Sequence, residues 1–167
     1  IELKNINLRL ANKEDTNFLL KMYNLGVKEN NFKNKNKISL QKHIHWYKKA
    51  LKSNSVYIYI CRKKKNKIGY VKFNIFHSNS CYVSIIIKKL YRKNDIGSFC
   101  LKKALKKCFK SINLKNIYAE VLKNNKVSQK FFEKNNFKKI KITKKLSEFF
   151  DKKNYLYLKN NENKIYK

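Results

Sequence analysis

The spacing of apolar residues changes along the chain, and each change predicts an element of secondary structure. Apolar and polar residues alternate over 6–11, which predicts a strand. Apolar residues then recur at helical spacing in two segments, with Asn12 and Ser39 in the capping positions that precede them. The expected apolar face of the second helix consists of Leu40, Ile44, Tyr47 and Leu51.

From residue 56 onward the pattern is mainly that of strands. It predicts strands over 56–61, 68–76, 82–87, 116–122, 137–143 and 155–159, and helices over 96–109 and 126–134. The element order is therefore β-α-α-β-β-β-α-β-α-β-β, without a linker or an internal repeat. We expect one α/β domain over residues 1–167, in which helices cover both faces of a single mixed sheet.

The large positive charge of the chain says less about its binding partners than its magnitude suggests. The 167 residues include 42 Lys+Arg and 10 Asp+Glu, which gives a formal net charge of +32. Lys, Asn and Ile are over-represented, Arg is scarce and Pro is absent, as drift in an AT-rich genome produces. Because the lysines are spread over every segment and DNA readers favour Arg, a nucleic-acid partner is not expected. Such a positive field still attracts small polyanions such as nucleotides and coenzymes.

The chain lacks the sequence signals of membrane, disulfide-rich and metal-binding proteins. No apolar run reaches the roughly 18 residues that a membrane span needs. The four cysteines contain no C-x-x-C pair, which argues against a disulfide scaffold or a zinc site. We therefore expect a protein of the reducing cytoplasm without a membrane partner or a metal.

The basic loop over 88–98 is the most informative chemical feature. It joins an apolar strand to a helix and includes Gly97 at the start of that helix. Backbone N–H groups and the dipole at a helix amino terminus favour a phosphate group there. The alternative is a solvated loop in which Gly97 only allows close packing.

Two motifs around this loop resemble those of the GCN5-related N-acetyltransferase (GNAT) superfamily. In that family a strand leads into the sequence R/Q-x-x-G-x-G/A, which binds the diphosphate of coenzyme A. In this chain the strand ends with Ile85–Ile87 and the loop sequence is Arg92–Gly97. The second family motif, N-x-x-S-x-x-F/L-Y/F-x-K-x-G-F, is similar to residues 125–137, which also follow a strand.

The amino-terminal half resembles one branch of the superfamily. The matching positions are Leu8, Arg9, Leu10, Ala11, Asn12, Asp15, Asn24, Val27, Lys28, Ile38, Ser39, Leu40, His43, Trp46 and Tyr47. That branch acetylates the 4-amino group of a nucleotide-linked amino sugar in pseudaminic-acid-type sugar synthesis. Together the similarities extend over residues 7–158.

The resemblance implies a fold and a reaction. The expected GNAT fold is a mixed, mostly antiparallel sheet of about seven strands flanked by four helices. Its fourth and fifth strands diverge, and the pantetheine arm of acetyl-CoA inserts between them. Acetyl-CoA is the expected co-substrate, no metal is needed, and the sugar amine attacks the thioester directly in a ternary complex. The expected partner is a small nucleotide sugar, and the sequence specifies no oligomeric state.

The resemblance also assigns roles to individual residues. The coenzyme-binding residues would be Ile85, Ile86, Ile87, Arg92, Lys93, Asn94, Asp95, Ile96, Gly97, Ser98, Asn125, Ser128, Phe131 and Phe132. Asn24, His43 and Trp46 would contact the acceptor. Glu120 and His43 are the candidates for proton removal from the amine. Each has a structural alternative: Glu120 as an exposed strand carboxylate, His43 as a surface histidine and Trp46 as a core residue.

Three positions depart from the family pattern. Asp95 replaces a Gly; it tolerates left-handed backbone, but its carboxylate either lowers the affinity for the diphosphate or turns outward. Asn136 replaces a second Gly and also tolerates positive φ. Phe132 occupies the position of a Tyr that is thought to protonate the leaving thiolate in many members.

Two other functions fit the same sequence. The first is acetylation of a protein amino terminus or lysine, as in ribosomal-protein acetyltransferases, which an open groove would favour. The second is a non-enzymatic module of this fold, degenerate at Asp95 and Phe132, that binds a ligand or partner through its basic surface. A pocket closed by residues 24–47 would favour the sugar.

Overall fold

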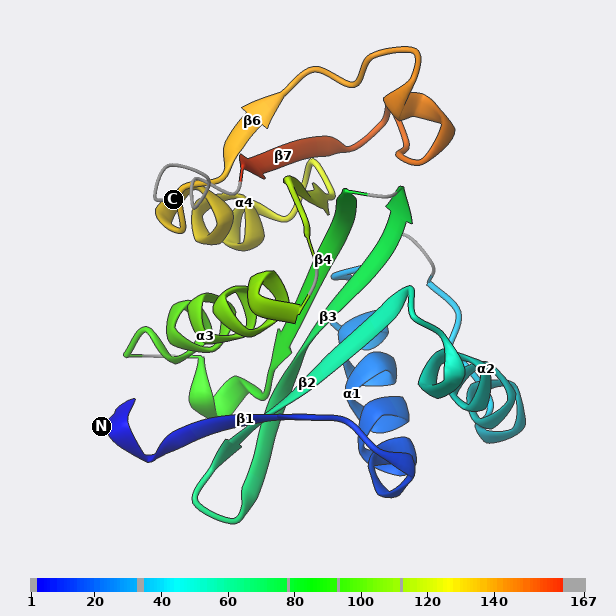
Figure 1. Cartoon of the computed structure of the whole chain (residues 1–167), viewed down its shortest axis with the longest axis vertical. Helices are drawn as coiled ribbons and strands as arrows, with labels where there is room; N and C mark the ends of the chain where they lie inside the picture. Colours follow the sequence, from blue (N-terminus) through cyan, green and yellow to red (C-terminus); the bar gives the residue numbers. More distant parts are fainter. Residues whose placement is uncertain (1–2, 33–34, 78, 93, 112, 161–167) are drawn as a thin grey trace.

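The strands form one seven-stranded sheet in the order β1-β2-β3-β4-β5-β7-β6 (Figure 1). The computed structural model describes residues 3–32, 35–77, 79–92, 94–111 and 113–160. The strands are β1 Ile6–Leu10, β2 Val56–Lys63, β3 Asn66–His77, β4 Ser80–Ile87, β5 Asn116–Val121, β6 Lys138–Ile140 and β7 Tyr155–Asn160. The main helices are α1 Thr16–Lys28, α2 Leu40–Lys52, α3 Ile96–Ser111 and α4 Lys126–Lys134. The predicted element order and the mixed fold class are confirmed.

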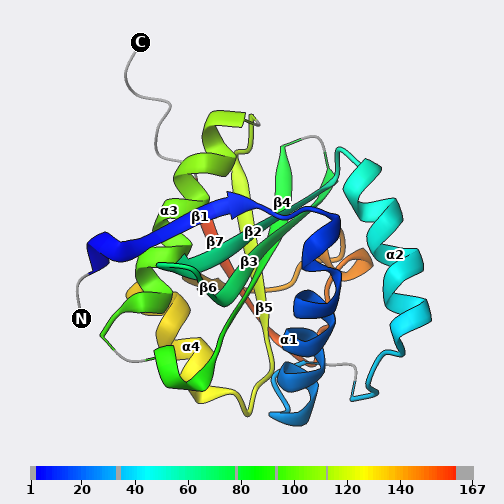
Figure 2. The same cartoon turned by 90° about the horizontal axis from the view of Figure 1, so that it is seen from below.

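The helices cover the two faces of the sheet in pairs. Figure 2 shows α1 and α2 on one side of the strands and α3 and α4 on the other. The larger core lies under α3 and α4 and contains the buried, free thiols of Cys61, Cys81, Cys100 and Cys108. The smaller core lies under α1 and α2 and includes Met22, Tyr47 and Ile86. The sheet therefore separates two hydrophobic layers, as its predicted coverage on both faces requires.

Strands β4 and β5 diverge soon after they begin to pair. Every other neighbouring pair in the sheet is antiparallel, whereas β4 and β5 are parallel. Their register runs from Ser80–Asn116 to Tyr82–Tyr118, although β4 continues to Ile87 and β5 to Val121. The expected separation of the fourth and fifth strands is therefore present.

The structure corrects two details of the sequence prediction. The strand predicted over 137–143 ends at Ile140, because the chain then turns at Thr143, whose carbonyl accepts the Ser147 N–H at 2.9 Å. The buried face of α2 consists of His43, Tyr47 and Ala50, while Leu40 and Leu51 are 47% and 42% exposed. The buried face of this helix is therefore rotated by part of a turn from the predicted apolar face, and the two share Tyr47.

The burial of polar residues on α2 has a physical reason. The His43 ring bonds the Thr16 carbonyl through Nε2 at 3.0 Å, and the Tyr47 hydroxyl donates to the Asn12 carbonyl at 2.7 Å. Each of the two polar side chains therefore has a hydrogen-bond partner inside the protein, which offsets the free-energy cost of its burial. These contacts attach α2 to the turn in which α1 begins.

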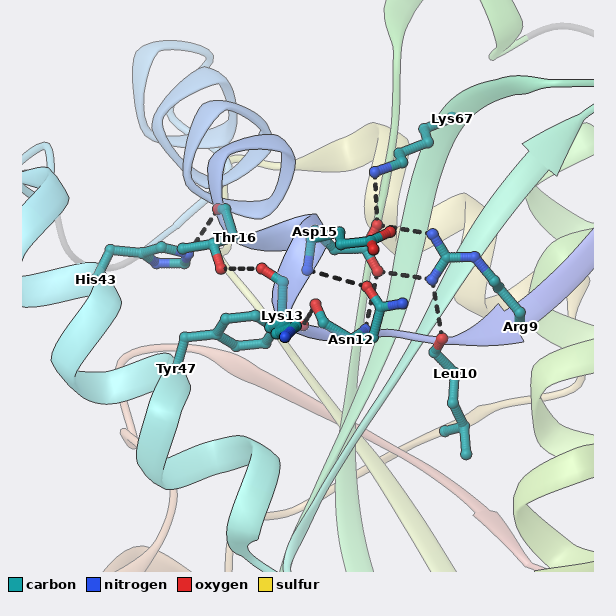
Figure 3. Close-up of polar contacts among 10 residues, drawn as sticks. Arg9, Leu10, Asn12, Lys13, Asp15, Thr16, His43, Tyr47 and Lys67 are labelled. Atoms are coloured by element: carbon teal, nitrogen blue, oxygen red, sulfur yellow. Dashed lines mark hydrogen bonds and ion pairs between the residues drawn. The ribbon is translucent and has the colours of Figure 1, made fainter.

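That turn is organised by Asp15, whose side chain is fully buried (Figure 3). Arg9 donates to its two carboxylate oxygens at 2.7 and 2.9 Å, and Lys67 Nζ lies 2.7 Å from Oδ1. The Asn12 N–H also donates to Oδ2, while the Asn12 side chain accepts the Glu14 N–H, which forms a capping box. The carboxylate thus joins β1, the start of α1 and the β2–β3 hairpin.

The contacts of Asp15 decide its protonation state. Burial alone would raise the pKa of its carboxyl group, but the hydrogen bonds from Arg9, Lys67 and the Asn12 N–H lower that pKa to about 2. The carboxylate therefore stays charged in the folded protein at neutral pH.

We expect Asp15→Asn to lower the free energy of unfolding by about 2 to 3 kcal/mol at pH 7, because an amide cannot satisfy both cations. The pKa of Asp15 falls from 3.8 to about 2 on folding, so this stabilisation is complete above about pH 4 and is lost towards pH 2. Urea denaturation at several pH values measures the difference. Glu14→Gln, at the exposed neighbour, is the control, and equal losses in both variants would contradict the prediction.

Candidate functional site

A cleft of about 970 Å³ opens where β4 and β5 diverge. Its walls are β4, β5, part of β3, the segment after α1, the loop before α3 and α4. Every predicted coenzyme residue that the structure describes lines this cleft, except Asn94, which is exposed in the loop, and Ile96, which is fully buried. Lys93 lies outside the described residues. The two family-like motifs therefore meet in one cavity.

The loop before α3 turns sharply at Asn94 and Asp95. Their φ angles are 56° and 57°, in the left-handed region that Asn and Asp enter more readily than other residues with a side chain. The Asp95 carbonyl then accepts the Phe99 N–H at 2.9 Å, which begins α3. The expectation that Asp95 could replace Gly in backbone conformation is confirmed, as is the positive φ of 62° at Asn136.

Gly97 lets α3 begin close against α4. A Cβ atom at this position would lie 3.1 Å from the Phe131 ring, so a side chain would require that ring to shift. The free N–H groups of the first turn of α3 therefore lie beside an open cavity without a side chain in front of Gly97. This arrangement fits an anionic group such as a diphosphate.

The Asp95 carboxylate points to α4. It forms an ion pair with Lys134, and both side chains are about 60% exposed. The start of α3 and the end of α4 are also joined by the Asn135 amide, which donates to Ser98 Oγ at 3.1 Å. The negative charge of Asp95 is therefore compensated by a cation of the same cleft wall.

Glu120 lies at the other end of the cleft, on β5. Its Oε1 accepts the Asp151 N–H at 2.9 Å and the Asn154 amide at 2.8 Å, so the carboxylate is oriented by the loop that precedes β7. Tyr82 of β4 also lines this end, and burial together with the charge of Glu120 raises the pKa of its hydroxyl. Glu120 is thus an exposed strand carboxylate that faces the cavity.

Lys72 is a cleft residue that the sequence did not single out. It lies on β3 opposite Ser84 of β4, and its Nζ is 5.2 Å from the centre of the Trp46 ring. Burial lowers the pKa of its ammonium group to about 8. A single lysine gives no sequence signal in a chain so rich in lysine. Only its place between the buried residues Val71 and Phe73 indicates that Lys72 lies on the other face of the strand.

The structure does not bring Asn24, His43 or Trp46 to the cleft wall. The Asn24 side chain accepts the Ile38 N–H at 2.9 Å and donates to the Ile38 carbonyl at 3.1 Å, which ties α1 to the entry of α2. His43 is 3% exposed, and burial, together with the nearby charge of Lys72, lowers its pKa. Trp46 is 39% exposed and contacts the cavity indirectly, through Lys72.

The Phe132 ring lines the cleft without a polar group. It is buried and packs against the rings of Phe131 and Phe137, with centroid distances of 5.3 and 5.1 Å. Within the described residues, no three His, Cys, Asp or Glu side chains are grouped to bind a metal ion. The same part of the chain contains no helix with the length and apolar character of a membrane span.

Comparisons with known proteins agree with this architecture. A family model described as the acetyltransferase (GNAT) family matches residues 20–137. No curated protein sequence matches significantly. At these sequence identities, the following similarities to solved structures show the fold alone.

Three solved structures illustrate the similarity. The spermidine N-acetyltransferase from Vibrio cholerae, solved with CoA and spermine, has a TM-score of 0.76 at 19% identity, and the match covers 93% of this chain and 94% of that one. The ribosomal-protein-alanine N-acetyltransferase from Brucella melitensis has a TM-score of 0.74 at 16% identity, covering 93% and 99%. FdhC, a nucleotide-linked sugar GNAT solved in its apo form, has a TM-score of 0.72 at 20% identity, covering 93% and 86%.

The ion pair of Asp95 leads to a prediction about coenzyme A binding. We expect Lys134→Met to weaken binding about two- to fivefold, because it leaves a negative charge beside the anion site, and the pair is exposed. The double variant Asp95→Asn, Lys134→Met should regain most of the affinity. Isothermal titration measures both, with Lys130→Met on the same helix as the charge control. A double variant that binds no better than Lys134→Met would contradict the prediction.

Proposed function

Because the chain belongs to the acetyltransferase (GNAT) family and is an acetyl-CoA-dependent N-acetyltransferase, we propose that its acceptor is a nucleotide-linked amino sugar. The observation that supports this choice is the position of Lys72, which places a positive charge in the cleft on β3, opposite Ser84 of β4 and beside the Trp46 ring. An acceptor with a diphosphate would neutralise that charge.

The coenzyme half of the proposed site is built from backbone more than from side chains. The N–H groups at the start of α3, around Gly97, would bind the diphosphate of the coenzyme. The diverging edge of β4, over Ile85–Ile87, would contact its pantetheine arm beside Asn125. Bound acetyl-CoA supplies the acetyl group as a thioester. The carboxylate of Asp95 does not oppose binding of the diphosphate at this position, because Lys134 compensates its negative charge.

Glu120 is the proposed proton acceptor. It faces the cleft near the point where β4 and β5 separate, and two hydrogen bonds fix its carboxylate. In the proposed reaction the acceptor nitrogen bonds to the acetyl carbon and passes its proton to Glu120, while the carbon–sulfur bond breaks. Since Phe132 has no hydroxyl, the thiolate would take its proton from solvent.

The overall charge favours an anionic acceptor over a polyamine. A formal net charge of +32 attracts a nucleoside diphosphate and repels a polycation. FdhC, described as a nucleotide-linked sugar GNAT, shares the fold, although the spermidine enzyme shares it equally well. The charges of this chain, rather than the fold, therefore support the sugar.

A panel of acceptors tests the proposal. Thiol release from acetyl-CoA should be fastest with UDP-linked amino sugars and weak with spermidine or with peptides that have a free amino terminus. Titration of the protein with acetyl-CoA should show binding before any acceptor is added. Binding without turnover on the whole panel would support a degenerate module instead, and a preference for peptides would overturn the sugar.

Lys72→Met should raise the KM for the UDP-amino sugar about tenfold, because a charge-assisted contact is lost, and should leave the KM for acetyl-CoA unchanged. The pKa of Lys72 is about 8, so its cation is present below that pH and is lost above it. The acceptor KM of the native protein should therefore rise above about pH 8, while that of Lys72→Arg should stay flat. Lys65→Met, in the exposed β2–β3 turn, is the control. An unchanged acceptor KM in Lys72→Met would contradict the prediction.

Glu120→Gln should lower kcat about 100-fold and change both KM values little, because the amide still accepts the bonds from Asp151 and Asn154 but cannot take the proton. The loss should shrink as the pH rises and more of the acceptor amine is already neutral. Glu148→Gln, on the exposed turn nearby, provides the matched control. Equal kcat values for Glu120→Gln and Glu148→Gln would exclude Glu120 as the base.

A further inference from the structure

A chain of four side chains links the loop before α3 to the start of α4 through the segment after α1. Arg92 is anchored by its Nε, which donates to the Ile87 carbonyl at 2.7 Å, and its Nη2 pairs with Glu29 Oε2 at 2.5 Å. The same Glu29 oxygen accepts the Asn31 amide at 2.9 Å. Asn31 Oδ1 in turn accepts the Asn125 amide at 3.3 Å. We call these four side chains, Arg92, Glu29, Asn31 and Asn125, the bridge.

The two ends of the bridge belong to the two family-like motifs. Arg92 follows β4 in the loop that leads to α3, and Asn125 is the N-cap of α4. Asn125 Oδ1 accepts the Ser128 N–H at 3.0 Å, which orients its amide so that Nδ2 is available to Asn31. The middle of the bridge belongs to neither motif but to the segment that follows α1. This segment therefore joins the two family-like motifs.

The segment after α1 is held in place by its own contacts. The Asn31 N–H donates to the Gly26 carbonyl at 3.0 Å, and Asn30 has a left-handed φ of 54°. Phe32 stacks on Tyr23 with centroids 5.1 Å apart. The Phe32 ring covers Gly26 so closely that a Cβ there would lie 2.4 Å from it. Asn31 is thus presented to Asn125 from a fixed position.

The bridge lines the cleft and leaves it open. All four side chains line the cavity, and the cavity has its volume of about 970 Å³ with the bridge formed. A ligand that lies along β4 beside Asn125 would therefore contact the bridge. Its departure would be easier if the contact between Asn31 and Asn125 were absent.

We propose that the bridge is a strap that retains the coenzyme, with Glu29 and Asn31 as positioning residues that act through Arg92 and Asn125. The proposal rests on the proposed function only in that the cleft binds acetyl-CoA. The strap slows the release of the coenzyme, and it connects the coenzyme loop to the helix pair α1 and α2 beside which the acceptor would bind.

Asn31→Ala tests the strap without a change of charge. It keeps the Arg92–Glu29 ion pair and the backbone bond of residue 31. Loss of the neutral hydrogen bond to Asn125, together with the bond from Asn31 to the Glu29 carboxylate, should raise the dissociation rate of coenzyme A about 3- to 10-fold in stopped-flow displacement. The association rate, the unfolding temperature and the kcat for saturated substrates should not fall. Asn7→Ala, an exposed Asn on β1 outside the cleft, is the matched control.

Gly26→Ala tests the same strap through its support. The added methyl group displaces Phe32, and with it Asn31, so this variant should also speed coenzyme release. The double variant Gly26→Ala, Asn31→Ala should release coenzyme A little faster than either single variant, because both changes break the same contact between Asn31 and Asn125.

The outcomes separate the strap from the proposed function. If the native protein binds no coenzyme A, the proposed function fails and the strap with it. If the native protein binds coenzyme A and Asn31→Ala releases it at the native rate, the strap alone is wrong. Faster association and tighter binding in Asn31→Ala would show that the bridge obstructs the cleft, which also overturns the proposal.

Discussion

The short pairing of β4 and β5 is the constraint on which the site depends. Parallel strands normally satisfy each other's backbone groups along their length, yet here the register covers Ser80–Tyr82 and Asn116–Tyr118 and then stops. Beyond that point the facing edges must find other partners, because unpaired backbone groups are costly in a dry interior. An extended ligand can supply them, and α3 and α4 close the cavity from one side. The cleft therefore exists because the sheet is incomplete.

The few acidic residues of the chain are compensated where they approach this cleft. Glu29 pairs with Arg92, Asp95 pairs with Lys134, and Glu120 accepts hydrogen bonds from Asp151 and Asn154. Each of these contacts also joins two elements of the cleft wall. In a chain of net charge +32 the cavity thus stays receptive to anions without a bare carboxylate at its coenzyme end.

Local patterns predicted most of the fold, and the resemblance predicted most of the residues that meet in the cleft. The limits of α4 and the left-handed backbone at Asp95 and Asn136 follow from residue type and spacing, which act over a few residues. Contacts that depend on a partner far away in the sequence were not predicted. His43 is buried because the Thr16 carbonyl accepts its hydrogen bond, and Asn31 meets Asn125 across 94 positions of the chain. Neither contact leaves a periodic trace in the sequence.

The proposed acceptor half of the cleft is positioned by the turn around Asp15. That carboxylate fixes the start of α1, and α2 is attached to the same turn through His43 and Tyr47 (Figure 3). The position of α2 in turn sets the position of Trp46, whose ring lies beside the Lys72 ammonium group at the cleft. A change in the turn would therefore move Trp46 and alter the surroundings of Lys72 while the coenzyme loop, held by Lys134 and Asn135, stayed in place. The proposed acceptor and coenzyme halves of the cleft are positioned by separate polar clusters, so on the proposed function acceptor preference could change without loss of coenzyme binding.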